Sequence, residues 1–302
     1  MVNITQKNSS LRKAIATAIV RTSKTETIIA VEQKKVPKGD IFEFSRAAGL
    51  LAIKKTSDVI PDCHPLPIEF AAITYNIKNL TIEISVEVHT IYKTGVEVEA
   101  MHGAAVTALV MYDMLKPIDK GVEIEMIRLA QKTGGKSDIK IGGHAALKSA
   151  VVVCSDSVSS GIKEDFSGKA IVSVLEKHDI RCSSYEVVPD DVTSIRTATT
   201  KLLDDNYDLI LYTGGTGLSK RDVTPDALMP LITRMIPGVM ETARHYGQQR
   251  NKHAMLSRGV AGFINNTLVI TLPGSKTAAE ETLAAVFPHV LHVFDVKEGH
   301  QH

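Results

Sequence analysis

A glycine-rich loop next to acidic residues is the strongest chemical signal in this sequence. It follows the apolar run at residues 208–213 and leads to Asp222. Glycines allow successive backbone N–H groups to turn toward an anion, and the carboxyl end of a buried parallel strand is where α/β sheets bind ligands. Thr224 and Pro225 fit the N-cap and N1 positions of a following helix. We therefore expect phosphate to bind at Gly214, Gly215, Thr216 and Gly217.

A second acid, Asp190, follows the alternating residues 181–188 at the end of another predicted strand. Carboxyl ends of parallel strands meet at one edge of a sheet, so Asp190 and Asp222 are expected to converge. Two carboxylates beside a triphosphate suit a bridging Mg²⁺ ion, which makes both of them candidate catalytic residues and metal ligands. Alternatively, Asp190 is only the N-cap of the helix predicted from residue 192.

Two further turns at predicted strand ends complete this candidate substrate site. The first is Ser155-Asp156, and the second is Pro273-Gly274-Ser275. After the second turn, Thr277 and Glu280 have the spacing of a capping box.

Four segments of the first half suit proton transfer and anion binding. Lys38 precedes Asp40, which fits the N-cap of a helix beginning near Phe42. His64 stands in a loop stiffened by three prolines, and a histidine titrates near neutral pH. Taken alone, each feature is more often a structural turn or a structural histidine.

Carboxylates form the other two segments. If residues 93–99 are extended, Glu97 and Glu99 share one face, repel each other and can hold a proton; the alternative is a solvated strand face. Asp113 and Lys116, three residues apart on an apolar helix, form a candidate acid–base couple. An exposed ion pair there would have no such meaning. Cationic cradles for phosphate are expected at Arg12, Lys38, Lys132 and Lys136.

The elements that must position these residues differ between the two halves. Apolar residues alternate with polar ones over residues 80–89, as in an antiparallel strand with one wet face, and residues 44–56 and 102–116 have helical composition. The first half is thus predicted to be α+β, an antiparallel sheet with helices on one face, ferredoxin-like. From residue 150, short apolar runs alternate with helical segments, which predicts an α/β domain with a mostly parallel sheet.

Length and composition bound the class of protein. The 302 residues suit two domains, predicted at 1–138 and 150–302 with a linker at 139–149. A net charge of +1 gives no reason to expect nucleic acid or a membrane surface as partner. Three scattered cysteines and the absence of a signal-peptide pattern predict a reducing, cytoplasmic location.

Taken in order, the segments of the first half resemble the MoaC family, the cyclic pyranopterin monophosphate synthases. The resemblance rests on KGD, AGLLAIKKTSDVIPDCHPLP, KTGVEVEAM, ALVMYDMLK and KTGGKS. It implies conversion of a cyclised GTP derivative (3',8-cyclo-7,8-dihydro-GTP) to cyclic pyranopterin monophosphate and diphosphate, without a cofactor. It also implies homo-oligomers, trimers or hexamers, with sites at subunit interfaces. Functional residues carried over from the family are Lys38, His64, Glu97, Glu99, Asp113, Lys116 and Lys132, with Asp113 as the catalytic acid–base residue and Asp62, Cys63 and Val98 at the substrate.

This chain departs from the family pattern at a few positions. Asp62 stands where leucine is usual, Asn3 replaces an aspartate, and Val98 replaces a methionine between the two glutamates. None of these removes a proposed proton-transfer group. A carboxylate at position 62 beside a polyphosphate is unfavourable unless it points away or pairs with a cation.

The second half resembles the MoaB/MogA family of molybdopterin adenylyltransferases, through SDS, DFSG, VPDD, TGGTGLSKRDVTPDA, PGVMETAR and LPGS. The resemblance implies transfer of AMP from ATP to molybdopterin with Mg²⁺, and places the catalytic acids at Asp190 and Asp222. We therefore predict a bifunctional enzyme of molybdenum cofactor biosynthesis, a lyase and a nucleotidyltransferase. The alternative is that the second half is a non-catalytic molybdopterin-binding or oligomerisation module.

Overall fold

The computed structural model describes residues 1–135 and 146–297. The chain divides into two compact units, Met1–Lys140 and Ile141–His302, which are treated separately below. Lys136 and most of the predicted linker at 139–149 lie outside the described residues, so the predicted boundaries remain predictions. Within the described part of that linker, Ser149 already belongs to a strand.

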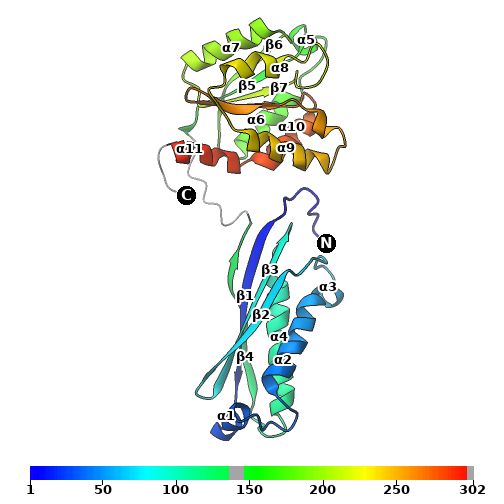
Figure 1. The fold of residues 1–302 in the computed structure, drawn as a ribbon, viewed down its shortest axis with the longest axis vertical. Coiled ribbons are helices and arrows are strands. Elements are labelled where there is room, and N and C mark those ends of the chain that lie inside the picture. The colour runs from blue at the N-terminus through cyan, green and yellow to red at the C-terminus, as the bar shows by residue number, and fades with distance from the viewer. Residues whose placement is uncertain (136–145, 298–302) are drawn as a thin grey trace. The chain divides into compact units, whose positions relative to one another are not determined.

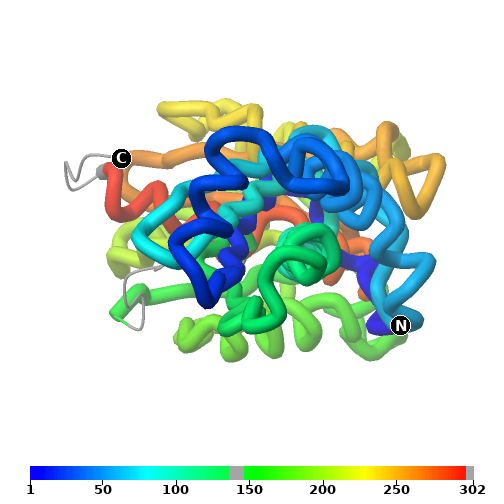
Figure 2. The backbone as a smooth tube through the Cα atoms, turned by 90° about the horizontal axis from the view of Figure 1, so that it is seen from below, coloured from blue at the N-terminus to red at the C-terminus, as the bar shows by residue number. Residues whose placement is uncertain are grey.

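The N-terminal unit is a four-stranded antiparallel sheet in the order β2-β3-β1-β4, with helices α2 and α4 packed on one face (Figure 1). Figure 2 shows α4 nearly end-on, away from the β2–β3 turn. The elements are β1 (Ser10–Arg21), α1 (Thr25–Glu32), α2 (Ile41–Lys54), α3 (Thr56–Val59), β2 (Phe70–Lys78), β3 (Thr81–Tyr92), α4 (Glu97–Leu115) and β4 (Glu123–Thr133).

Alternation along the strands and small residues between the helices build this core. The inward-facing Ile82, Ile84 and Val86 of β3 are fully buried, as the pattern predicts. A Cβ atom on Gly49 of α2 would lie 2.2 Å from Thr107 Oγ1 of α4, so the two helices can meet this closely only because residue 49 has no side chain.

Helix α4 begins earlier than the sequence pattern indicates. The prediction that Glu97 and Glu99 share one face of an extended segment is wrong, because both lie in the first turn of α4. Residues two apart on a helix are separated by about 200° around its axis. The alternation of valine and glutamate imitates a strand, but acidic residues also suit the positive end of a helix.

The C-terminal unit has a six-stranded sheet in the order β6-β5-β7-β10-β9-β8. Its first four strands are parallel, and β9 and β8 continue the sheet with antiparallel pairing, so the prediction of a mostly parallel α/β sheet is confirmed. The elements are β5 (Ser149–Cys154), α5 (Asp156–Ser159), α6 (Ser167–Glu176), β6 (Cys182–Val188), α7 (Val192–Asp204), β7 (Leu209–Thr213), α8 (Thr224–Leu228), η3 (Met229–Leu231), β8 (Arg234–Met235), α9 (Pro237–Gln248), η4 (Ala254–Leu256), β9 (Ala261–Ile264), β10 (Thr267–Leu272), α10 (Lys276–Val286), η5 (His289–Leu291) and α11 (His292–Lys297).

Helices cover both faces of this sheet, as Figure 1 shows. Helices α6, α9 and α10 pack on one face, and α7 and α8 pack on the other. Strands β5, β7 and β10 are buried along their whole length. Loops that leave the carboxyl ends of β5, β6, β7 and β10 therefore gather at one edge of the sheet. Among the described residues, no helix combines the length and the apolarity needed to cross a membrane.

Candidate active sites

The predicted phosphate loop follows β7 as a tight turn held against its neighbours. Gly214 and Gly215 have φ angles of +98° and +59°, which favour glycine. A Cβ on Gly214 would lie 2.1 Å from the Cys154 carbonyl oxygen, so the loop passes directly against the end of β5. The Gly214 N–H donates to Leu272 O at 3.2 Å, which ties the loop to the end of β10 as well.

Two hydrogen bonds link Asp190 and Asp156 at the carboxyl end of the sheet. The Asp190 N–H donates to Asp156 Oδ1 at 2.9 Å, and the Asp156 N–H donates to Asp190 Oδ2 at 3.2 Å. Arg221 pairs with Asp156. The other Asp190 oxygen, Oδ1, is buried and has no hydrogen-bond partner among the described residues. Burial and the negative charges of Asp156 and Asp222 raise the pKa of Asp190.

Asp222 approaches the same turn from its other side. A Cβ on Gly217 would lie 2.9 Å from Asp222 Oδ2, and one on Gly215 would lie 3.2 Å from Asp190 Oδ1. The two predicted acids therefore flank the glycine turn. Burial disfavours ionised Asp222, but hydrogen bonds from Ser219 and from the Gly217 amide outweigh it and lower the pKa of Asp222. The Ser219 N–H donates to Asp222 Oδ2 at 2.7 Å.

Helix caps near this site differ from the predictions by one or two residues. Asp191, and not Asp190, is the N-cap of α7, so Asp190 is left for the site. Thr224 is the first residue of α8 instead of its N-cap, and its hydroxyl donates to Gly214 O at 2.9 Å. Ser275, and not Thr277, caps α10 by accepting from the Ala278 N–H.

The remaining predicted residues of this unit also lie at strand ends. Ser155 caps α5 directly after β5. The Pro273 carbonyl accepts from Thr213 Oγ1 at 2.8 Å, and a Cβ on Gly274 would lie 3.2 Å from Gly214 Cα. The turn after β10 thus packs against the turn after β7, and Thr216 between them is buried.

Arg258 is a residue of this site that the sequence analysis missed. Its backbone and side chain donate hydrogen bonds to carbonyl groups of the 214–226 loop, and its guanidinium pairs with Asp226. A lone arginine in the irregular segment before β9 carries no periodic or spacing signal. Only the fold brings it to the loop.

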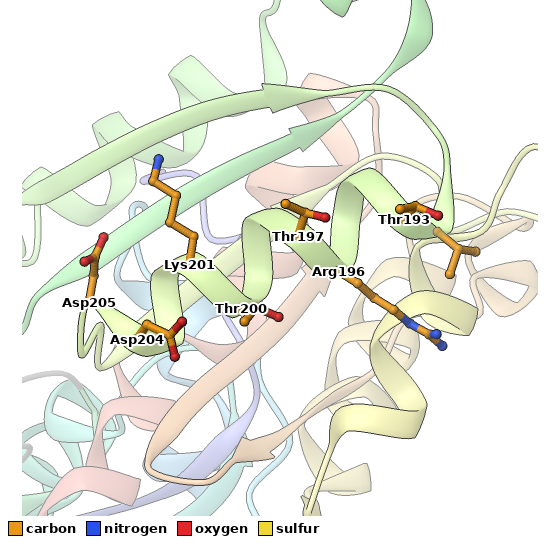
Figure 3. A pocket seen from close by; sticks show the side chains of 8 residues that line it. Thr193, Arg196, Thr197, Thr200, Lys201, Asp204 and Asp205 are labelled. Carbon is orange, nitrogen blue, oxygen red and sulfur yellow. The ribbon is translucent and has the colours of Figure 1, made fainter.

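A surface hollow of about 680 Å³ lies elsewhere, along α7 (Figure 3). It is lined by residues of α7 and by Asp205, and none of the predicted site residues lines it. In Figure 3, Arg196 points from α7 toward α8, where its Nε donates to Ala227 O at 3.0 Å.

In the N-terminal unit, Asp113 lies between two lysines near the end of α4. Its carboxylate pairs with Lys38 at 2.6 Å and with Lys116 at 2.8 Å. Hydrogen bonds from Lys116 and Lys38 lower the pKa of Asp113 to about 2. The two lysines therefore hold Asp113 as a carboxylate. Its side chain is half exposed.

A second group lies at the beginning of α4. Glu99 is buried, and Cys63 Sγ donates to its Oε1 at 3.2 Å. Burial raises the pKa of Glu99, and burial together with the Glu99 contact raises the pKa of Cys63 to about 11. Lys132 pairs with Glu97 at 3.3 Å. A neutral thiol and a carboxyl group with a raised pKa form a proton-holding pair.

The structure keeps these two groups apart within one chain. Glu97 is the first residue of α4, whereas Asp113 lies in its last turns. Sixteen residues of α-helix span about 24 Å. The predicted residues of the first half thus form two clusters, a Lys38–Asp113–Lys116 cluster and a Cys63–Glu97–Glu99–Lys132 cluster.

Four other predicted residues lie near the second cluster in sequence or in the sheet. His64 follows Cys63 and is half-buried, and Val98 is 44% exposed. The Asp62 side chain is 86% exposed, and its Oδ1 lies 2.8 Å from the Met1 amino group. Arg12 lies on β1, two positions from the β1 residue opposite Lys132. Its buried Nε has no hydrogen-bond partner within residues 1–135 and 146–297.

Two family profiles match the chain, one for each unit. The profile described as the MoaC family matches residues 1–135, and the one described as a probable molybdopterin binding domain matches residues 150–292.

Two relatives in sequence agree with this division. A "Molybdenum cofactor biosynthesis bifunctional protein" of Chlorobaculum tepidum is 37% identical and covers 100% of this chain and 96% of its own length. A "Cyclic pyranopterin monophosphate synthase" of Clostridium botulinum is 44% identical, covering 45% of this chain and 87% of its own. The crystal structure of the molybdopterin biosynthesis enzyme MoaB from Thermus thermophilus is 38% identical, with a TM-score of 0.46, over 49% of this chain and 95% of that chain.

Proposed function

The chain belongs to the family of bifunctional molybdenum cofactor biosynthesis proteins, and on that basis we propose which reaction each unit performs and with which residues. The C-terminal unit transfers AMP from ATP to molybdopterin. The N-terminal unit converts a cyclised GTP derivative, 3',8-cyclo-7,8-dihydro-GTP, to cyclic pyranopterin monophosphate and diphosphate.

The observation that supports adenylyl transfer most directly is the pair of acids on either side of the glycine turn, Asp190 and Asp222. In the described part of the chain, no three His, Cys, Asp or Glu side chains group closely enough to hold a metal ion. Mg²⁺, however, is commonly held by one or two carboxylates together with substrate phosphates. The unpartnered Oδ1 of Asp190 fits such a ligand.

Asp190 and Asp222 would thus hold Mg²⁺ together with the triphosphate, and the bound ion would neutralise charge that develops on the phosphate oxygens. The chain's own part is to bind and align. Backbone amides at residues 214–217 would cradle the phosphates. The turn at Pro273–Ser275 lies directly against this loop and would orient the molybdopterin phosphate, whose oxygen attacks the α-phosphorus of ATP while diphosphate leaves.

Incubation with molybdopterin, ATP and Mg²⁺ tests this proposal through the adenylated product, detected by mass spectrometry. We expect Asp222→Ala to abolish it while pyranopterin formation continues, and Asp113→Ala to have the opposite effect. Asp204→Asn, at the distant end of α7, is the matched control and should leave both activities intact. Loss of both activities in a folded single variant would contradict two independent sites.

The alternative, a non-catalytic molybdopterin-binding or oligomerisation module, is not favoured. A scaffold needs neither a buried carboxylate without a partner nor a second acid held by amides beside the same turn.

For the N-terminal unit we propose a homo-oligomer whose synthase site joins residues from two copies. The supporting observation is the distance of about 24 Å that α4 imposes between Glu97 and Asp113. A proton donor and a proton acceptor must both reach one substrate. The Lys38–Asp113–Lys116 cluster of one copy would therefore act with the Cys63–Glu97–Glu99–Lys132 cluster of another copy. Arg12, His64 and Lys136 would add contacts to the substrate phosphates.

Mixing two inactive variants tests the shared site. Asp113→Ala and Glu99→Gln should each abolish pyranopterin formation alone. After co-refolding in equal amounts, about a quarter of the sites would combine two intact clusters, so about a quarter of the activity should return. A mixture as inactive as its components would show that each site is built within one chain. Size-exclusion chromatography with light scattering distinguishes trimer from hexamer.

Three finer assignments complete the proposal. The synthase reaction requires no cofactor. The ferredoxin-like description of the N-terminal unit is supported by its strand order, β2-β3-β1-β4, with a helix-containing connection between β1 and β2. A cytoplasmic location remains a prediction from cysteine usage.

A further inference from the structure

Arg258 contacts the 214–226 loop through both its backbone N–H and its guanidinium group. Its N–H donates to Thr216 O at 2.9 Å, and its Nε donates to Gly217 O at 2.8 Å. Its Nη2 donates to the Asp222 carbonyl. Both Nη atoms also contact the Asp226 carboxylate, each at 3.0 Å. One residue thus joins the beginning of the loop, its acidic end and the first turn of α8.

The geometry of the peptide groups determines on which side of the turn their N–H groups lie. The C=O and N–H groups of a trans peptide point in opposite directions. Arg258 takes up the carbonyls of Thr216 and Gly217, so the N–H groups of the same two peptides point away from it. The Gly217 amide donates to the Asp222 carboxylate. Arg258 therefore binds the side of the turn opposite the one that holds the Asp222 carboxylate.

We propose that Arg258 is a positioning residue that holds residues 216–222, and with them the Asp222 carboxylate, in the shape that binds the metal–nucleotide complex. It does so from behind the turn, through carbonyl oxygens. Its planar guanidinium with three nitrogens suits this task, whereas a lysine ammonium cannot reach the carbonyls of Gly217 and Asp222 and the Asp226 carboxylate at once. The metal-binding part of this inference rests on the proposed adenylyl transfer.

Limited digestion with trypsin measures how readily the loop opens, and it requires neither a ligand nor an activity assay. Lys220 and Arg221 lie within the loop and are exposed. Cleavage after them in the native protein requires the loop to open locally. Hydrogen bonds to a charged group are worth a factor of roughly ten or more each, so Arg258→Ala should speed cleavage at these two sites at least tenfold. The cleavage rate of Arg258→Lys should lie between those of Arg258→Ala and the wild type.

Arg196 provides the matched control. It also donates to a carbonyl of α8, at Ala227 (Figure 3), but within the described part of the chain it has no hydrogen bond or ion pair with the glycine turn. Arg196→Ala should leave cleavage after Lys220 and Arg221 within about twofold of the wild type. Equal cleavage in Arg258→Ala and wild type would overturn the positioning role, whatever reaction the unit catalyses.

Calorimetric titration of the full chain with ATP at rising Mg²⁺ tests the link to Asp222. We expect Arg258→Ala to raise the half-saturating Mg²⁺ concentration about tenfold or more, with the stoichiometry unchanged. An unchanged Mg²⁺ requirement with reduced stoichiometry would mean that Arg258 only supports folding, and would overturn the inference. If the wild type binds no Mg²⁺–ATP, the proposed function fails, and the trypsin comparison alone decides whether Arg258 holds the loop.

Discussion

Replacing Asp119 by asparagine should lower the melting temperature of the N-terminal unit without removing any proposed catalytic group. Asp119 is buried in the loop after α4 and accepts four hydrogen bonds. Ser23 donates through both its N–H and its hydroxyl, Thr27 donates through its hydroxyl at 3.0 Å, and the Gly121 N–H donates at 3.0 Å. This carboxylate thus joins the β1–α1 connection to the α4–β4 connection.

The expected size of the effect follows from the shape of the two side chains. A carboxylate accepts two bonds at each oxygen here, whereas an amide keeps one oxygen and turns an NH₂ group toward the other two donors. A hydrogen bond to a charged group contributes about 1.5–3 kcal/mol, so after partial relaxation the loss should be about 3 kcal/mol. For a unit of this size, that corresponds to a drop of roughly 10 °C in melting temperature.

The effect should also depend on pH. Burial opposes ionisation, but the bonds from Ser23, Gly121 and Thr27 outweigh it and lower the pKa of Asp119 to about 2. The pKa in the unfolded chain is higher, about 3.9. The stabilising contribution is therefore complete above pH 4 and is lost as the pH falls toward 2. The difference between wild type and Asp119→Asn should shrink over the same interval.

Differential scanning calorimetry of the full chain measures both effects, with the C-terminal unit as internal reference. Asp58→Asn is the matched control, since it breaks only an exposed ion pair with Lys55 and should cost less than about 1 kcal/mol. Equal melting temperatures for the Asp119 and Asp58 variants at pH 7 would refute the assigned role. So would a difference from wild type that persists unchanged at pH 2.

Three other outcomes are expected. Gly49→Ala should destabilise the N-terminal unit by about 1–2 kcal/mol in urea unfolding, because the new methyl group overlaps α4. Gly238→Ala, which has open space around it, should cause no such loss. Equal effects of the two substitutions would contradict the close helix crossing. Asp190→Asn should stabilise the C-terminal unit above about pH 4, because the raised pKa of Asp190 means that its ionised form is unfavourable in the folded state. In thermal melts this gain in stability should vanish at lower pH, and a loss of stability at pH 7 would rule the explanation out. Alkylation of Cys63 by iodoacetamide at pH 8, measured by mass spectrometry, should be slow and should become faster in Glu99→Gln. An unchanged alkylation rate would show that Glu99 does not contribute to the raised pKa of the thiol.

Periodicity along single elements predicted much of the fold. The alternation around Ile84 indicated a strand with one buried face, and the apolar run before Gly214 indicated a buried strand that ends in a loop. These signals are local, since they depend on a face being buried and not on which segment covers it.

Choices between neighbouring residues could not be predicted in the same way. Asp190 and Asp191 are chemically identical candidates for the cap of α7, and only the path of the backbone after β6 decides that Asp191 caps the helix. Ser275 and Thr277 posed the same problem at α10, because both suit an N-cap and the capping-box spacing favoured the wrong one.

Relations across the fold were beyond the sequence altogether. The order of motifs suggested one site in the first half, but the length of α4 divides those residues into two clusters. Arg258 was missed for a related reason, since its partners Thr216, Gly217 and Asp222 lie about forty residues earlier in the chain. A contact of this kind leaves no periodic trace in one sequence.

The burial of β5, β7 and β10 on both faces has a consequence for how the chain is synthesised. β7 needs β10 as its parallel partner, with Leu209 opposite Leu268, so the central sheet cannot close until residues 267–272 have left the ribosome. Until then, short apolar segments of high β propensity remain uncovered, and such segments are the ones that aggregate. The N-terminal sheet is complete at Thr133, so all of its strands are available before the second unit has been synthesised. Chaperone demand should therefore fall on nascent chains of the second unit, halted between β7 and β10.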